Sequence, residues 1–105
     1  MPLIARSSLF EDRRRAERIS VSIPASLRDS SGIRMRVTID EISATGFRCE
    51  YVRHLEADTL LWVTLPSIVP LRVRPVRFNE FIYAFEFDIP LHEAVVDHFV
   101  QKFRR

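Results

Sequence analysis

The fold is decided by residues 33–51, which read IRMRVTIDEISATGFRCEY. Apolar and polar residues alternate over 33–39, and the same two-residue period returns over 47–51. This period is typical of a β-strand with one buried face. The residues between the two runs, Glu-Ile-Ser-Ala-Thr-Gly at 41–46, predict a polar turn. The stretch therefore predicts two strands joined by a turn.

Further strand-like runs flank this stretch on both sides. Residues 19–27 alternate in the same way, and the polar residues 29–32 supply a turn that joins them to 33–39 as a hairpin. Pro24 cannot donate a ladder hydrogen bond, so it indicates an edge or a bulge. Three more strands are predicted downstream, at residues 60–65, 71–78 and 81–87. The first of these three is nearly all apolar, which predicts a strand covered on both faces.

The hydrophobic period changes after Pro90. Over residues 91–103 apolar side chains recur at three- and four-residue spacing, which predicts an amphipathic helix. Six short strands and one helix predict an all-β fold with a terminal helix, namely a six-stranded antiparallel β-barrel whose open end the helix covers. The predicted organisation is a flexible basic arm at residues 1–18, followed by the barrel and its helix at residues 19–105.

Composition places the chain among globular domains. Its 105 residues favour a single domain, and 47% apolar residues suffice for an ordinary core. Cys49 is the only cysteine, which excludes an intramolecular disulfide and a cysteine-cluster zinc site. Neither a signal peptide nor an apolar run of about 20 residues is visible, so we expect a cytoplasmic protein without membrane insertion.

The positive charge is almost entirely arginine, since every basic residue except one is arginine. Arginine presents a planar fork that meets phosphate groups or guanine edges with two hydrogen bonds, although biased genomic composition is an alternative explanation. Four arginines cluster before the first strand: Arg13, Arg14, Arg15 and Arg18. Guanidinium groups this close repel one another unless an anion lies among them. The alternative is a solvated basic segment that neighbouring acidic residues balance.

Three residues of the polar turn can contact an anionic ligand. Ser43 offers a hydroxyl to a phosphate oxygen, and Glu41 offers a carboxylate to donor groups on a guanine edge. Gly46 permits a positive φ and a close approach of the backbone. The alternative is a glycine-closed turn in which the serine makes only a local hydrogen bond.

Taken together, the two motifs resemble the signature of the PilZ domain, R-x-x-x-R followed by D/N-x-S-x-x-G. Here Arg14-x-x-x-Arg18 precedes the first strand, and Glu41-x-Ser43-x-x-Gly46 follows the second. The segments Tyr83–Phe87 and Pro90–His92 are similar to the last strand and the helix start of that family. The resemblance covers roughly residues 13–103 and implies a six-stranded barrel with a C-terminal helix. It also implies binding of the bacterial second messenger cyclic di-GMP.

The resemblance also implies roles for single residues. Arg14 and Arg18 are expected to take guanine edges and phosphates, Ser43 a phosphate or the neighbouring backbone, and Gly46 to keep the rim open. A basic residue at the place of Arg13 accompanies binding of a stacked pair of nucleotides in this family, so we expect two ligands. The predicted ligand-binding set is Arg13, Arg14, Arg15, Arg18, Asp40, Glu41, Ser43 and Gly46.

The sequence departs from the family signature at one position. Glu41 stands where the family has Asp or Asn, and Asp40 lies one place earlier. Asp40 points to the opposite face if strand geometry persists through this position. Either affinity is weakened, or the turn is bulged so that Asp40 can substitute. Some members of the family bind no nucleotide and act through protein contacts, so a non-binding adaptor is the alternative function.

The remaining residues predict no chemistry. We expect no enzyme, no metal and no cofactor, because no nucleophile–base pair, glycine-rich phosphate loop or metal-binding histidine pair is visible. The histidines are expected at the surface or in caps, whereas Cys49, Trp62 and the phenylalanines are expected in the core. Arginine-studded strands at Arg34, Arg36, Arg72 and Arg74 could grip nucleic acid, but 16 basic and 14 acidic residues make this the least favoured partner. The prediction is a cyclic di-GMP receptor with an unidentified protein partner.

Overall fold

The computed structural model describes residues 17–105. The strands are β1 (Ile19–Asp29), β2 (Arg34–Ile42), β3 (Gly46–Glu50), β4 (Leu61–Thr64), β5 (Leu71–Asn79) and β6 (Ile82–Phe87), and they are followed by the helix α2 (Glu93–Phe103). Among these residues no helix has the length and apolar character needed to span a membrane.

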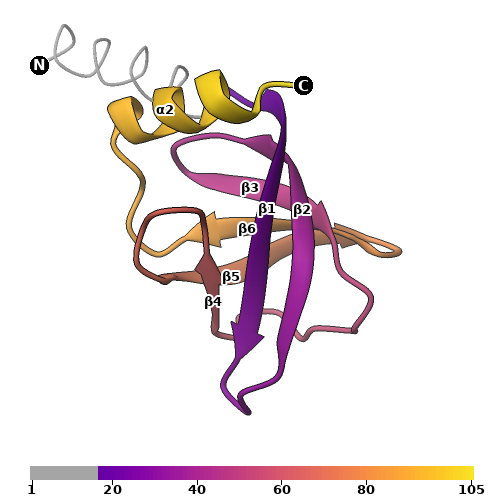
Figure 1. The fold of residues 1–105 in the computed structure, drawn as a ribbon. Helices are drawn as coiled ribbons and strands as arrows, with labels where there is room; N and C mark the ends of the chain where they lie inside the picture. The colour runs from indigo at the N-terminus through magenta and orange to yellow at the C-terminus, as the bar shows by residue number, and fades with distance from the viewer. Residues whose placement is uncertain (1–16) are drawn as a thin grey trace, which may run out of the picture.

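The six strands close into an antiparallel barrel in the order β1-β2-β3-β6-β5-β4, as Figure 1 shows. The pairs β1–β2, β2–β3, β4–β5 and β5–β6 join strands that are consecutive in sequence, whereas β3 pairs with β6. β1 closes the barrel by pairing with β4 through Ser26–Asp29. The six-stranded barrel and the terminal helix predicted from the hydrophobic periods are therefore confirmed. The largest difference in bounds is at β2, which extends past residue 39 to Ile42, so that Glu41 belongs to a strand and not to the turn.

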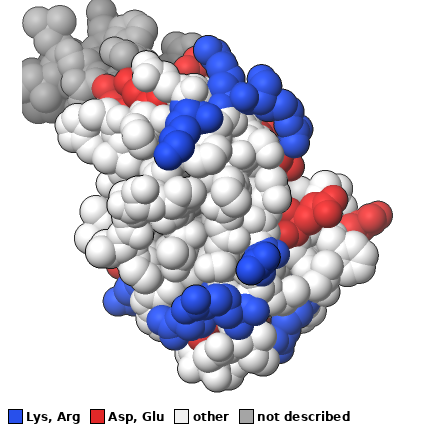
Figure 2. Space-filling view, viewed as in Figure 1, with Lys and Arg blue, Asp and Glu red and all other residues white. Residues whose placement is uncertain are grey.

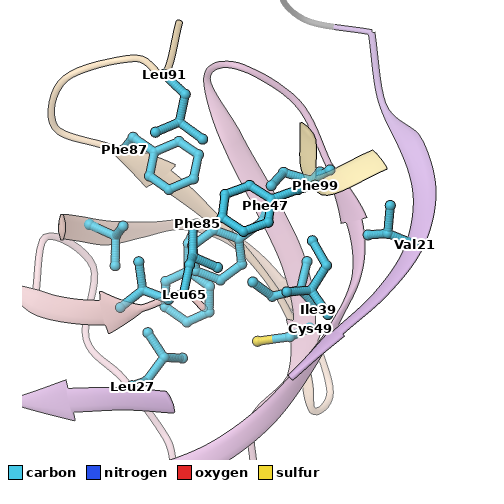
Figure 3. Close-up of a cluster of buried hydrophobic side chains, with 14 of the residues drawn as sticks. Val21, Leu27, Ile39, Phe47, Cys49, Leu65, Phe85, Phe87, Leu91 and Phe99 are labelled. Carbon is cyan, nitrogen blue, oxygen red and sulfur yellow. The ribbon is translucent and has the colours of Figure 1, made fainter. Parts of the chain in front are cut away.

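The core consists of the inward-facing side chains of the strands, and Figure 3 shows how they converge. The ring centroids of Phe47 and Phe85 are 5.2 Å apart, and those of Phe47 and Phe87 are 5.5 Å apart. Cys49 is fully buried, as predicted, and desolvation raises the pKa of its thiol to about 12. This cysteine is therefore a packing residue.

The helix α2 covers one open end of the barrel (Figure 1). His92 caps its first turn, because the His92 Nδ1 accepts a hydrogen bond from the backbone N–H of Ala94 at 3.0 Å. The helix buries Val96, Phe99 and Val100 against the barrel. The prediction of a helix over one end is confirmed, and His92 has one of the two roles, surface or capping, that were expected of the histidines.

Some aromatic side chains lie outside the core, contrary to the prediction. Phe78 and Phe81 at the β5–β6 turn are 56% and 60% exposed. Strand β4 is covered on one face only, since Leu61 and Val63 are buried while Trp62 remains partly exposed. A strand this short carries too few residues to reveal its outward face by periodicity, so its apolar composition was misleading.

Candidate functional site

The turn between β2 and β3 is closed by its own serine. The backbone N–H of Ser43 donates to the carbonyl of Gly46 at 2.9 Å. The Ser43 hydroxyl oxygen accepts from the N–H groups of Thr45 and Gly46, each at 3.2 Å. Because Ser43 is only 3% exposed, its hydroxyl shapes the backbone that a ligand would meet.

Gly46 is required by a close approach of two strands. A Cβ at this position would lie 2.1 Å from the carbonyl oxygen of Phe85 on β6. Gly46 does not use the positive φ that a glycine permits, since among the described residues the only glycine with a positive φ is Gly32. The predicted close backbone approach is correct, but the neighbour is β6.

Two backbone hydrogen bonds from residues much later in the sequence also hold this turn. The carbonyl of Thr45 accepts from the N–H of Phe87 at 2.9 Å, and the carbonyl of Ala44 accepts from the N–H of Leu91 at 2.8 Å. These bonds tie the turn to the end of β6 and to the segment before α2. The residues from Ser43 to Gly46 therefore form a fixed rim on the barrel.

Beside this rim, an arginine on β3 gathers the two neighbouring carboxylates. The Arg48 Nε donates to the Asp40 Oδ1 at 2.9 Å, and its Nη1 lies 3.3 Å from the Glu41 Oε2. The hydrogen bond to Asp40 raises the pKa of the Arg48 guanidinium above its ordinary value. The three side chains are only 23 to 38% exposed, so they form a compact charged cluster.

A β-bulge brings Asp40 and Glu41 to the same arginine. On β2, Ile39 pairs with Cys49 and Glu41 pairs with Arg48, so Asp40 is an extra residue without a partner on β3. Strand geometry therefore does not persist through Asp40, and the expected bulge is present. The substitution of Asp40 for Glu41 in ligand binding stays a prediction.

Arg18 lies against the same rim. Its Nη1 is 3.8 Å from the Glu41 Oε1, and Glu41 thus lies between two arginines, Arg18 and Arg48. The sequence expectation that Arg18 meets residues 41–46 is consistent with this placement. Arg13, Arg14 and Arg15 lie outside the described residues, and their roles remain predictions.

A small pocket of about 60 Å³ opens between these side chains. Charged residues from β2, β3 and β6 line one part of it, and Val76 and Ala84 supply apolar surface. Its lining comprises Arg18, Glu41, Ile42, Ser43, Thr45, Gly46, Phe47, Arg48, Val76, Ala84, Phe85 and Glu86. The pocket joins the arginine before β1 to the rim of the barrel.

The sequence reasoning missed Arg48. The sequence feature that could have identified Arg48 is its position two residues after Gly46. There it lies at an outward position between the buried Phe47 and Cys49. In an antiparallel pair such a residue faces the outward side chains of the preceding strand, here the carboxylates at the end of β2. Cross-strand reasoning, and not the motif alone, was needed to find it.

Comparison with known proteins agrees with this geometry. The PilZ domain family model matches residues 12–103. The PilZ domain of CeSA from a cellulose synthesizing bacterium superposes with a TM-score of 0.65 at 17% sequence identity, over 83% of this chain and 98% of that one. No match is found among curated protein sequences.

A second solved structure is similar in fold. The PlzA protein of Borreliella burgdorferi, solved in complex with c-di-GMP, superposes with a TM-score of 0.62 at 18% identity. The superposition covers 90% of this chain and 43% of PlzA. At such identities the two likenesses establish the fold, whereas the family match extends over most of the sequence. The chain therefore belongs to the PilZ domain family.

Proposed function

We propose that this protein is a receptor for cyclic di-GMP that binds the nucleotide across the rim at residues 43–46. The observation that carries the proposal is the placement of Arg18, the last arginine of the R-x-x-x-R motif, against Glu41 at 3.8 Å. The two halves of the signature thereby meet on one surface. Arginine there can fork onto a phosphate or onto the O6 and N7 of guanine.

The pocket holds only part of such a ligand. Its volume of about 60 Å³ is small beside the 300–1,000 Å³ typical of sites for small molecules. The ligand would lie over the rim, and Arg13, Arg14 and Arg15 would supply further contacts from the segment before β1. The apolar surface of Val76 and Ala84 is suited to the face of a base.

The energetics also require several arginines. Micromolar affinity corresponds to about −8 kcal/mol, and each hydrogen bond to a charged group contributes about 1.5–3 kcal/mol. Ordering each residue of the segment costs about 1–2 kcal/mol. Two arginines are therefore too few, and the proposal requires four arginines, base stacking and the fixed rim to act together. A stacked pair of nucleotides would bring more phosphates to the same arginines.

Glu41 holds Arg18 in place until the ligand arrives. The pair is long, and the Arg18 side chain is 46% exposed, so it stabilises the protein by at most about 1 kcal/mol. A phosphate can displace Glu41 at small cost, and Arg48 keeps the released carboxylate neutralised. The segment before β1 would then follow Arg18 and change the surface that a partner protein meets.

A non-binding adaptor is the second candidate function. It is favoured by the internal bonding of the rim, since the Ser43 hydroxyl and the Glu41 carboxylate both have partners within the protein. In that case the rim is structural, and a partner protein would bind whether or not the nucleotide is present.

Isothermal calorimetry with cyclic di-GMP tests the proposal. Wild-type protein is expected to bind in the micromolar range, and Arg14→Ala or Arg18→Ala to abolish the heat while circular dichroism stays native. The matched control is Arg104→Ala, which removes an exposed arginine at the end of α2 and should bind as wild type does. If wild-type protein gives no heat with cyclic di-GMP at tens of micromolar, about ten times the expected dissociation constant, the receptor function is excluded and the non-binding adaptor is the remaining candidate.

A further inference from the structure

Four outward residues form a row at the end of the barrel opposite the rim. The cross-strand partner of Arg28 on β1 is Arg34 on β2, and on its other side Arg28 is paired with Trp62 on β4. Trp62 is in turn paired with Arg72 on β5. Directly opposed residues lie on the same face of a sheet. We call these four residues the Arg–Trp row.

The row faces outward because its neighbours along each strand face inward. Leu27, Leu61 and Val73 are buried, and each precedes or follows a member of the row. The row therefore presents three guanidinium groups and one indole to the surface. Over three strand spacings it is about 14 Å long.

Among the residues that the structure describes, the arginines of the row have no carboxylate partner. Within residues 17–105, no ion pair involves Arg28, Arg34 or Arg72. Arg28 and Arg34 oppose one another directly, an arrangement that destabilises a sheet unless an anion lies near it. The row is thus a surface where positive charge has been left uncompensated.

The nearest acidic residue along β1 is committed elsewhere. One carboxylate oxygen of Asp29 accepts from the backbone N–H and the hydroxyl of Ser31 and from the N–H of Ile33. Its other oxygen lies 3.9 Å from the Nη1 of Arg53. Asp29 therefore closes the β1–β2 turn and does not neutralise the row.

The indole adds a stacking surface to this charge. The Arg28 guanidinium lies 4.6 Å from the centroid of the Trp62 ring, so an aromatic plane and a planar cation adjoin. A parallel set beside the row comprises Arg36 and the hydroxyls of Ser26 and Thr64, which are cross-strand partners. Arginines and hydroxyls are the side chains that contact phosphates.

The row is separate from the nucleotide rim. Arg18 and Arg28 are ten positions apart along the chain, roughly 30 Å at the rise of a strand. Figure 2 shows basic side chains gathered at the lower end of the molecule, where the β1–β2 turn lies in Figure 1. A second basic group lies at the upper end beside α2.

We propose that the Arg–Trp row binds single-stranded nucleic acid, with phosphates on Arg28, Arg34, Arg36 and Arg72 and a base stacked against Trp62. Unpaired bases are required because a stacking side chain needs an exposed base face. These contacts involve phosphates and the face of a base but no base edge, so binding is independent of the nucleotide sequence. The nearly equal numbers of basic and acidic residues argued against nucleic acid as a partner. That balance is a sum over the whole chain, and the arginines at the rim end have carboxylate partners that the arginines of the row lack among the described residues.

Two signals test the proposal with a labelled single-stranded DNA of about 12 nucleotides. Trp62 is the only tryptophan, so its fluorescence reports stacking directly. Anisotropy of the labelled strand should give an affinity that falls with salt, with a logarithmic slope of about −3 for four phosphate contacts. The variant Arg28→Gln/Arg72→Gln should reduce this slope by about half. Trp62→Ala should weaken binding about tenfold without changing the slope.

A control of equal charge separates the row from general attraction. Lys102→Gln/Arg104→Gln removes two charges at α2 and should keep the wild-type slope and the fluorescence change. No anisotropy change at about 50 mM salt with about 100 µM protein would overturn the proposal. Equal weakening by the control, or binding without a change in Trp62 fluorescence, would overturn it too.

The outcome is independent of the nucleotide receptor. Arg28→Gln/Arg72→Gln should bind cyclic di-GMP as wild type does, and a native circular dichroism spectrum shows that the variant is folded. If the protein binds cyclic di-GMP but no single-stranded DNA, only the proposed function of the row is contradicted. If it binds single-stranded DNA but no cyclic di-GMP, only the receptor function is contradicted.

Discussion

The two ends of the β1–β2 hairpin carry arginines in opposite electrostatic situations. At one end Arg18 faces the carboxylate of Glu41, which Arg48 also contacts. At the other end Arg28 faces Arg34, with no carboxylate partner among residues 17–105. The difference teaches that cross-strand pairing, and not the number of arginines, decides how each end is organised. The arginines beside the rim already contact carboxylates, whereas the arginines of the row are accessible to anions.

The two glycines of the chain repeat this contrast. Gly46 at the rim lies against the backbone of Phe85, whereas Gly32 in the β1–β2 turn has a φ of 93° and no heavy atom within 4 Å of an added Cβ. One glycine is needed for space and the other for backbone conformation. The rim therefore tolerates less change than the turn beside the row.

Gly46→Ala should have the largest effect on stability. Its Cβ would overlap the Phe85 carbonyl and separate β3 from β6, so the free energy of unfolding should fall by about 3 kcal/mol or more. Gly32→Ala is the matched control and should cost only about 1 kcal/mol, for the left-handed conformation alone. Urea denaturation measures both. Equal losses would contradict the contrast between the two ends.

Removing one arginine from each end should change stability in different directions. Arg48→Ala removes the cation that Asp40 and Glu41 both contact, and the free energy of unfolding should fall by about 1 kcal/mol. Arg34→Gln relieves the repulsion on Arg28, so stability should stay unchanged or rise by about 0.3 kcal/mol. Urea unfolding at low salt gives the comparison. A loss of stability in Arg34→Gln equal to that in Arg48→Ala would show that the row has a hidden acidic partner.

Acid should reveal a smaller effect at the row end. The pKa of Asp29 lies below its ordinary value, chiefly because the Ser31 hydroxyl donates to its carboxylate. The folded-state pKa is lowered, so this contribution to stability is present above about pH 4 and is lost as the pH falls through the folded-state pKa. Asp29→Asn should therefore lose less stability than wild type between about pH 5 and about pH 3. Identical acid profiles of the urea midpoint would contradict this role.

Most of the fold could be predicted because the hydrophobic periodicity of each segment indicates its secondary structure. The alternation over residues 19–27 and 33–39 and the helical spacing over 91–103 each reflect one buried face, and the barrel follows from them. The burial of Cys49 and the surface or capping roles of the histidines were also local inferences. Trp62 escaped prediction because only four residues of β4 pair, too few to show which side faces out.

The geometry of the site depends on long-range register, which periodicity does not contain. The bulge at Asp40 follows from pairing with β3, and the space around Gly46 is set by Phe85, which lies far away in sequence. The motif identified Glu41, Ser43 and Gly46 as a group. Only the packed strands show that Ser43 shapes the rim from within and that Arg48 completes the charged cluster.

A titration of isotope-labelled protein with cyclic di-GMP, followed by backbone amide chemical shifts, tests the central claim most directly. Binding at the rim predicts large shifts at Arg18, Gly46 and Arg48, and shifts near zero at Arg28 and Trp62. The same titration of Arg18→Ala should leave all these signals in place. Shifts concentrated at the Arg–Trp row, or absent throughout for the wild-type protein, would contradict the account.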